Sequence, residues 1–174
     1  MNMLGETLPR RHLWIGMAPM EIRPLNPLDR EPLAALIHRI ESFSPDEIRW
    51  ALKLIDLAAK PNNPEYQILV AESGGKPVGY VCYGPVAMTE GTFDLHWIAS
   101  DPDVRGQGVG ASLVSAMEGE LRKRKGRVVR VEASATEDYG PARGFYQSMK
   151  YQEEARFKDF YHVGDDLIIL KKVL

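Results

Sequence analysis

The stretch LHWIASDPDVRGQGVGA, residues 95–111, carries the strongest fold signal of the chain. It begins with the apolar run 95–99, which predicts a strand, and ends with glycines at positions 106, 108 and 110. Glycine lets the backbone approach a ligand closely, because no Cβ stands in the way. The N–H groups that follow can converge on an anion at the positive end of a helix dipole. Arg105 adds a guanidinium fork that suits a phosphate. The stretch therefore predicts a strand, a pyrophosphate-binding loop and a helix, in that order.

The composition of the chain bounds its class. Its 174 residues, 44% of them apolar, are enough for one domain with a full core. The net charge of −2 gives no general attraction to nucleic acid or to a membrane surface, so neither is expected as a partner. The one basic block, residues 122–125, directly precedes Gly126. Cations there complement the dipole of a helix that ends with this glycine at its C′ position, so the block predicts a helix terminus.

Cys82 is the only cysteine, so no internal disulfide can form and a cytoplasmic location is expected. Because Cys82 lies in an apolar stretch, we expect a small buried side chain rather than a nucleophile. No segment reaches the length of a transmembrane helix, and residues 1–18 lack the apolar run of a signal peptide. We predict that residues 1–18 are an N-terminal extension and that residues 19–174 form a single domain.

Hydrophobic periodicity and turn residues predict a mixed α/β (α+β) protein. Ser44, Pro45 and Glu47 have the spacing of a capping box at the start of a helix. Four helices are predicted, over residues 28–41, 45–60, 109–125 and 141–149. Seven strands are predicted, over residues 20–23, 67–72, 78–83, 92–99, 128–133, 153–160 and 167–172.

One possible ligand of the glycine loop is a dinucleotide. Gly106, Gly108 and Ala111 fit the pattern G-x-G-x-x-G/A, and Glu132 lies near the position of an acid that binds ribose. An NAD-dependent oxidoreductase is therefore one hypothesis, ranked third after the two that follow below. Against it, residues 100–105 separate the strand from the loop, several strands precede the motif, and the chain that follows is too short for the remaining parallel units.

The other possible ligand is coenzyme A, and here the chain resembles a known family. The sequence Asp-Pro-x-x-Arg-Gly-Gln-Gly-Val-Gly after a strand is similar to motif A of the GNAT superfamily of acyl-CoA N-acyltransferases. The fixed positions of that motif, Arg/Gln-x-x-Gly-x-Gly/Ala, are filled by Arg105, Gly108 and Gly110. Residues 145–151 are similar to the family's Phe-Tyr-x-x-x-Gly-Phe pattern. The resemblance covers residues 20–174. It implies a mixed, mostly antiparallel central sheet of six to seven strands flanked by about four helices.

The resemblance also implies a function: an N-acetyltransferase that moves an acetyl group from acetyl-CoA to a primary amine, by direct transfer in a ternary complex and without a metal. Backbone groups in the strand before the loop would hold the pantetheine amides and polarise the thioester carbonyl. Tyr146 matches the tyrosine that protonates the departing thiolate, a task that suits a phenol with a pKa of about 10. The cofactor-binding residues implied are Trp97, Ile98, Ala99, Arg105, Gly106, Gln107, Gly108, Val109, Gly110, Ala111 and Tyr146.

A base is expected because the acceptor amine must lose a proton before it attacks, unless it arrives neutral. Glu132 is the first candidate, since it resembles the strand glutamate of the ribosomal-protein N-terminal alanine acetyltransferases. Asp94 and His96 follow closely, two residues apart on one side of the strand that leads into the loop. An imidazole with a pKa of about 6.5 can act near neutral pH.

The acceptor side carries weaker signals. Acidic residues gather at positions 137, 138, 159, 165 and 166, which would attract a cationic amine, and the aromatic segment 160–162 could close over a small molecule or a peptide N-terminus. A second hypothesis is a non-catalytic acyl-CoA-binding module. A homodimer is conceivable through the strand after Leu167. Lys150 replaces the family's glycine, where a left-handed conformation costs a non-glycine residue about 1 kcal/mol.

Overall fold

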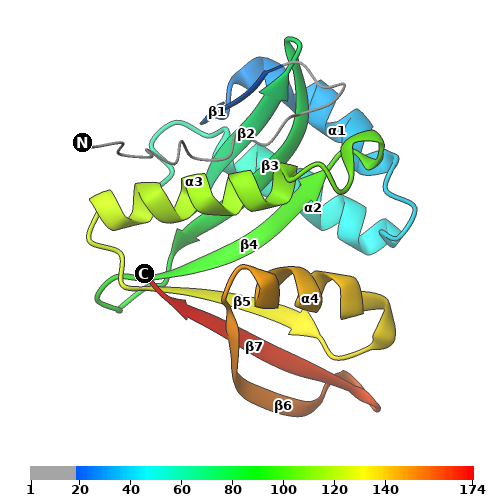
Figure 1. Ribbon diagram of the computed structural model, residues 1–174, viewed down its shortest axis with the longest axis vertical. Coiled ribbons are helices and arrows are strands. Elements are labelled where there is room, and N and C mark those ends of the chain that lie inside the picture. The colour runs from blue at the N-terminus through cyan, green and yellow to red at the C-terminus, as the bar shows by residue number, and fades with distance from the viewer. Residues whose placement is uncertain (1–18) are drawn as a thin grey trace, which may run out of the picture.

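A computed structural model describes residues 19–174, and the predicted extension, residues 1–18, lies outside them. One sheet of seven strands runs through these residues, in the order β1-β2-β3-β4-β5-β7-β6 (Figure 1). The strand after Leu167, β7, is paired on both edges, so the expectation that it could pair between subunits was wrong. The strands are β1 Met20–Pro24, β2 Gln67–Ser73, β3 Lys76–Pro85, β4 Thr92–Ser100, β5 Val128–Ser134, β6 Gln152–His162 and β7 Asp165–Val173. The helices are α1 Arg30–His38, α2 Pro45–Ala58, α3 Val109–Lys123 and α4 Gly140–Ser148, with short 3-10 turns η1 Pro27–Asp29, η2 Pro102–Val104 and η3 Glu137–Tyr139. The predicted mixed, mostly antiparallel fold is confirmed.

The sheet opens between β4 and β5, the only parallel neighbours among the described strands. All other neighbouring strands are antiparallel, but β4 and β5 run parallel and pair only over Thr92–Asp94 and Val128–Arg130. From Leu95 onward β4 pairs with no other described strand on its β5 side, and Figure 1 shows the two strands diverging. The backbone groups on that side of β4 are therefore available to a ligand.

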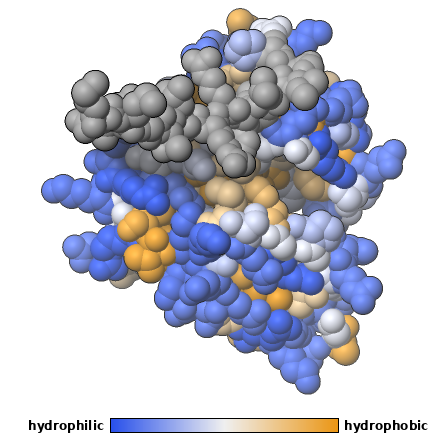
Figure 2. Space-filling view, in the orientation of Figure 1, coloured by the Kyte–Doolittle hydropathy of each residue, from blue (hydrophilic) through white to orange (hydrophobic). Residues whose placement is uncertain are grey.

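Two cores cover the two faces of this sheet. On one face α3 lies across the strands and buries Leu113, Met117 and Leu121 in a cluster that also contains Tyr146 of α4. On the other face α1 and α2 pack through an apolar cluster to which the half-buried Trp97 belongs. On the face that α3 and α4 cover, hydrophilic side chains occupy most of the surface and apolar ones gather toward its middle (Figure 2). No helix among residues 19–174 is long and apolar enough to cross a membrane.

Local sequence signals explain several element ends. The predicted capping box at the start of α2 is confirmed, because the Ser44 hydroxyl accepts from the Glu47 N–H and the Glu47 carboxylate accepts from the Ser44 N–H. The helix predicted over residues 28–41 is shorter, since a second capping box between Asn26 and Asp29 first forms the turn η1, and α1 then ends at His38. The helix itself is confirmed, and its start differs from the prediction because the asparagine cap was overlooked.

Two left-handed residues end helices. Lys150 has a φ of 71°, as expected for the position where the family has glycine. At the end of α3, Arg124 is the C-cap and Lys125 takes the left-handed conformation with a φ of 60°, so the prediction that Gly126 occupies the C′ position was wrong. Gly126 is required for a different reason: a Cβ there would lie 2.9 Å from the carbonyl oxygen of Leu121, which accepts the Gly126 N–H.

Candidate active site

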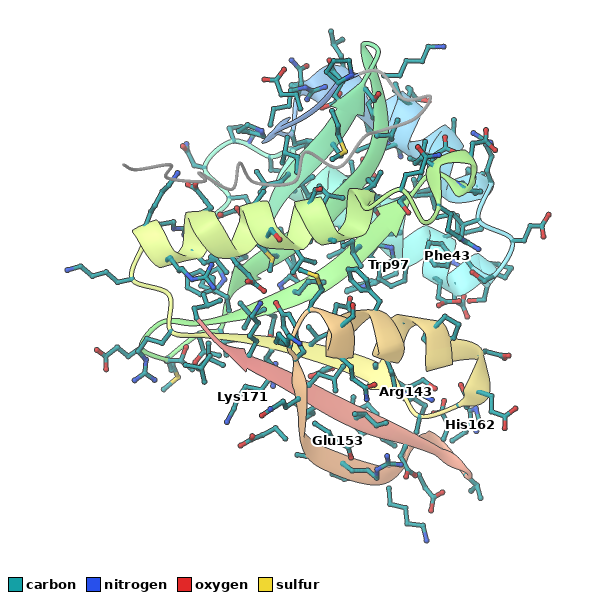
Figure 3. The ribbon with its side chains drawn as sticks, in the orientation of Figure 1. Phe43, Trp97, Arg143, Glu153, His162 and Lys171 are labelled. Carbon is teal, nitrogen blue, oxygen red and sulfur yellow. The ribbon has the colours of Figure 1, made fainter. Side chains whose placement is uncertain are left out.

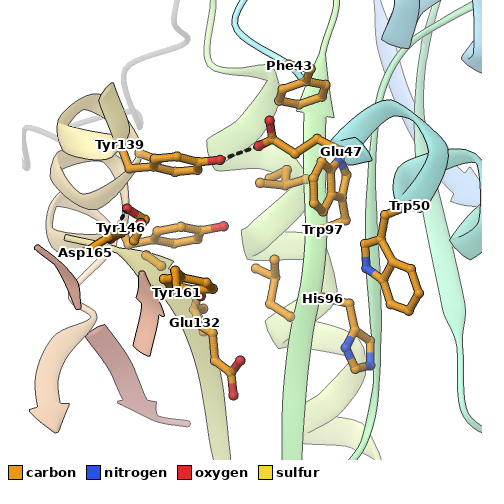
Figure 4. Close-up of a pocket in the computed structure, with 16 residues that line it drawn as sticks. Phe43, Glu47, Trp50, His96, Trp97, Glu132, Tyr139, Tyr146, Tyr161 and Asp165 are labelled. Carbon is orange, nitrogen blue, oxygen red and sulfur yellow. Dashed lines mark hydrogen bonds between the residues drawn. The ribbon is translucent and has the colours of Figure 1, made fainter. Parts of the chain in front are cut away.

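A cavity of about 500 Å³ opens where β4 and β5 diverge (Figure 4). Its walls come from the start of α2, the middle of β4, the end of β5, the start of α4 and the β6–β7 hairpin. The lining residues are Phe43, Glu47, Trp50, Leu95, His96, Trp97, Ile98, Val131, Glu132, Ala133, Ser134, Tyr139, Ala142, Tyr146, Tyr161 and Asp165. The cavity thus brings together Tyr146, Glu132 and His96, all of which were predicted as catalytic. Glu132 lies 14 residues before Tyr146 in the sequence, and His96 lies 36 residues before Glu132.

Strand alternation places the candidate acid and base on opposite faces of the sheet. Val129 and Val131 of β5 belong to the core beneath α3, together with Tyr146. Successive side chains of a strand point to opposite faces, so Glu132 points to the face that α2 covers. The cavity reaches both faces because the missing β4–β5 pairing leaves the sheet open there.

Tyr146 is held rigidly in α4. Its ring is 6% exposed and makes edge contacts with Phe145 and Tyr151, at centroid distances of 5.2 and 5.7 Å. Its hydroxyl points into the cavity and has no hydrogen-bond partner among the described residues (Figure 4). Burial raises the pKa of this phenol well above its ordinary value. Tyr146 therefore remains protonated at neutral pH and can donate a proton to a developing anion.

Asp94 differs from the other candidate bases because both of its carboxylate oxygens accept hydrogen bonds from an arginine. Its carboxylate accepts two hydrogen bonds from Arg130, at 2.7 and 2.8 Å, in a bidentate pair. Glu132 lies 3.6 Å from the same guanidinium, and its side chain is 47% exposed. Asp94 lines a second, smaller cavity of about 220 Å³ with His96 and Arg130, and not the main one. Of the two carboxylates, Glu132 is the one that faces the main cavity.

His96 lies at an irregularity in β4. On β3, Tyr83 pairs with Leu95 and Cys82 with Trp97, so His96 is the extra residue of a bulge. A bulge redirects side chains, and here the imidazole lines both cavities and packs 5.1 Å from the Tyr66 ring. Burial, opposed by the charge of Asp94, lowers the pKa of His96 below its ordinary value. The neutral imidazole that results can accept a proton.

Of the strand residues predicted to bind the cofactor, Trp97 and Ile98 have half-buried side chains and Ala99 is buried. The Trp97 ring packs edge-on against the Phe43 ring, with 5.3 Å between the ring centroids (Figure 4). Its Nε1 donor is buried without a partner among the described residues. Trp97 and Ile98 line the cavity, whereas Ala99 does not, and all three lie beyond the last residue of β4 that pairs with β5.

The glycine loop lies outside the cavity and has the shape of an anion cradle. Gly106 and Gly108 have φ values of 77° and 81°, and a Cβ at Gly106 would meet no atom within 4 Å. Helix α3 starts directly after Gly108, so the N–H groups of its first three residues, 109–111, have no acceptor within the helix. Arg105 is exposed. These residues fit a pyrophosphate group.

Ion pairs to the preceding turn hold the loop in place. Arg39, just after α1, bonds to Asp101 at 2.9 Å and to Asp103 at 2.6 Å. Asp101 also accepts the Asp103 N–H at the start of η2. This connection between α1 and the loop could not be predicted from the local sequence, because the paired residues are more than 60 positions apart.

Two site residues were missed in the sequence. Glu47 was predicted only as a cap, yet its second carboxylate oxygen accepts a hydrogen bond from the Tyr139 hydroxyl across the cavity (Figure 4). Burial opposes ionisation of Glu47, but its hydrogen bonds with Tyr139 and Ser44 prevail and lower its pKa. Nothing in the local pattern around Tyr139 pointed to this role. Asp165, by contrast, was among the acidic residues expected near an acceptor, and it does line the cavity.

Comparisons with known proteins agree with this geometry. A sequence model described as the acetyltransferase (GNAT) family matches residues 33–151. The chain is similar to the solved structure of a protein assigned to the GNAT family from Desulfovibrio desulfuricans, with 32% identity and a TM-score of 0.85 over 89% of this chain and 99% of that one. Comparison with curated protein sequences gave no match.

More distant structures share the fold. The ribosomal-protein-S18-alanine N-acetyltransferase of Escherichia coli has 22% identity and a TM-score of 0.70, over 89% of this chain and 94% of that one. The PaiA N-acetyltransferase of Thermoplasma acidophilum, solved with coenzyme A, has 19% identity and a TM-score of 0.69, over 90% of this chain and 99% of that one. The site and the fold therefore define an acyltransferase. The chain belongs to the acetyltransferase (GNAT) family.

Proposed function

We propose that the protein transfers the acetyl group of acetyl-CoA directly to a primary amine in a ternary complex. One observation carries this proposal: a single cavity, opened by the divergence of β4 and β5, exposes a protonated phenol from one face of the sheet and a carboxylate from the other. Direct transfer needs a proton acceptor for the amine and a proton donor for the leaving thiolate, on the two sides of the reacting carbonyl.

The cofactor side is formed by the glycine loop and the unpaired edge of β4. The N–H groups of residues 109–111 would bind the pyrophosphate, with Arg105 as a further donor. The edge of β4 from Leu95 onward would hold the pantetheine amides by strand-like hydrogen bonds. An N–H group of this edge, directed at the thioester carbonyl, would stabilise the negative charge that develops on its oxygen.

The proton transfers follow from the positions of three side chains. Glu132, with neutral His96 nearby in the same cavity, would take a proton from the acceptor ammonium, directly or through water. The free amine then forms the new C–N bond while the C–S bond breaks. Tyr146 would give its hydroxyl proton to the sulfur, so CoA leaves as a thiol.

The test is acetyl transfer by Tyr146→Phe. Purified protein is mixed with acetyl-CoA and a panel of amines, and both CoA thiol and acetylated amine are measured. We expect Tyr146→Phe to lower kcat by about 100-fold or more while acetyl-CoA binding persists, because general acid catalysis commonly contributes that much. Tyr83→Phe is the matched control, since Tyr83 is buried but does not line the cavity. Equal kcat for wild type and Tyr146→Phe would refute the acid role.

The second hypothesis, a non-catalytic acyl-CoA-binding module, makes the opposite prediction. Acetyl-CoA would bind, but transfer to every amine would stay at background. The third hypothesis, an NAD-dependent oxidoreductase, has no support in the fold, because the sheet is mostly antiparallel and Glu132 lies in the cavity.

A further inference from the structure

The main cavity carries more negative charge than one ammonium group would neutralise. Three carboxylates line it, Glu47, Glu132 and Asp165, and none of its described lining residues is a lysine or arginine. His96 is kept neutral by the shift of its pKa. A buried or half-buried carboxylate is stable when an opposite charge or several donors accompany it.

The partners of these carboxylates are mostly neutral. Asp165 is buried, accepts a hydrogen bond from the Ser134 hydroxyl at 2.7 Å and lies 3.7 Å from the ring of His162. Glu47 accepts hydrogen bonds from the Ser44 N–H and the Tyr139 hydroxyl. Within residues 19–174, only Glu132 of the three has an arginine within 4 Å, and that guanidinium is already bound in bidentate fashion by another carboxylate.

Glu47 is separated from the candidate base. In Figure 4 it lies on one side of Tyr146 and Glu132 lies on the other. The Tyr139 hydroxyl reaches it from the opposite wall, so the carboxylate is held at the cavity rather than turned to solvent. A cation bound at Glu47 would therefore not be the nitrogen that gives its proton to Glu132.

Unsatisfied polar groups and aromatic walls indicate that the cavity receives a ligand. The Tyr146 hydroxyl, on a side chain 6% exposed, points into it without a partner among the described residues. Six lining residues are aromatic: Phe43, Trp50, Trp97, Tyr139, Tyr146 and Tyr161. Aromatic faces attract cations and also cover methylene groups.

We infer that the acceptor is an aliphatic amine with at least two cationic nitrogens, one acetylated next to Glu132 and one bound by Glu47. This inference rests on the proposed function. The methylene groups between the nitrogens would lie along the aromatic wall, and Asp165 would add to the field that attracts the second cation.

The experiment compares amines that differ by one charge. Cadaverine and pentylamine have the same chain length and the same reactive group, but only the diamine carries a second cation. We expect wild type to show a kcat/KM for cadaverine about 10-fold or more above that for pentylamine, since a hydrogen bond between two charged groups is worth that much. In Glu47→Gln the ratio should fall toward one, through the KM for cadaverine and without a change in the KM for acetyl-CoA.

Glu47→Gln is expected to fold, because glutamine also completes a capping box. The matched control is Glu153→Gln on β6, which removes an exposed carboxylate that pairs with Arg156 outside the cavity (Figure 3). Glu153→Gln should keep the wild-type ratio. Melting temperatures of both variants check that neither change acts through the fold.

Each other outcome overturns the inference. Equal kcat/KM for the two amines in wild type, or an unchanged ratio in Glu47→Gln, would refute the second cation site and leave the proposed function standing. The inference would also be refuted if a peptide without charged side chains were acetylated at its N-terminus faster than any diamine. Binding of acetyl-CoA with no transfer to cadaverine or pentylamine would overturn the inference alone. The proposed function would be refuted only if transfer to every amine of the panel stayed at background.

Discussion

The buried carboxylate of Glu118 connects α3, which follows the glycine loop, with the segment after α4, the helix that carries Tyr146. Glu118 lies on α3 and is 3% exposed. It accepts hydrogen bonds from Lys172 of β7 at 2.7 and 2.8 Å, and from the hydroxyl of Tyr151, three residues after the end of α4, at 3.1 Å. Glu118→Gln keeps the size of the side chain and removes its charge, so Lys172 loses its counter-charge in a largely buried position.

The magnitude follows from the burial of the pair. Removing one partner of a buried ion pair costs about 3–5 kcal/mol. Because the side chain of Lys172 is 17% exposed and can reach water, we expect a loss of about 2–3 kcal/mol in the free energy of unfolding. For a domain of this size, this lowers the melting temperature by about 4–12 °C. Urea denaturation followed by fluorescence measures the free energy, and thermal scanning measures the shift.

Glu120→Gln is the control for this prediction. Glu120 lies two residues further along the same helix, is half-exposed and sits 3.8 Å from Lys123, a surface pair of the kind worth 0–1 kcal/mol. A second variant, Glu118→Gln combined with Lys172→Met, should recover part of the loss, because no buried charge remains unpaired. Arg122 also pairs with Glu118, at 3.4 Å, but its side chain is 50% exposed and stays solvated. If Glu118→Gln costs no more than Glu120→Gln, the argument from burial is wrong.

Two further predictions concern titrating groups. Burial raises the pKa of the Cys82 thiol to about 12, so the native protein should not react with Ellman's reagent. The denatured chain should show one reactive thiol, and a reactive thiol in the native protein would contradict the buried position. Burial lowers the pKa of His96 in the folded state, so below about pH 6.5 the unfolded chain binds more protons than the folded one and stability falls as the pH falls. His96→Gln should flatten this part of the curve of unfolding free energy against pH, and a curve parallel to that of wild type would contradict the shift.

The chemistry of the cofactor side was readable in the sequence because it depends on neighbours in the chain. The glycines of residues 106–110, the strand before them and the helix after them form one continuous segment, and their conformations follow from local rules. The capping box at Ser44 and the left-handed Lys150 were predicted for the same reason. The buried position of Cys82 followed from the apolar strand around it.

The surroundings of the candidate bases were not readable in this way. The sequence placed Glu132 before Asp94 and His96 only through a family resemblance. The tertiary structure adds that Asp94 is paired with Arg130, whereas Glu132 lines the cavity. The bulge at His96 depends on the register between β3 and β4, which no local pattern sets.

By itself, then, the sequence determined the family, the order of elements and the loop suited to a pyrophosphate, since each is written in short-range spacing. Only the tertiary structure decided where β4 and β5 stop pairing, and with it the cavity that brings Tyr146 and Glu132 together from opposite faces. It also placed Glu47 opposite Tyr139, 92 residues away in the chain. The physical reason is that these contacts depend on how helices and strands pack across the sheet, and packing joins residues whose separation in sequence carries no signal.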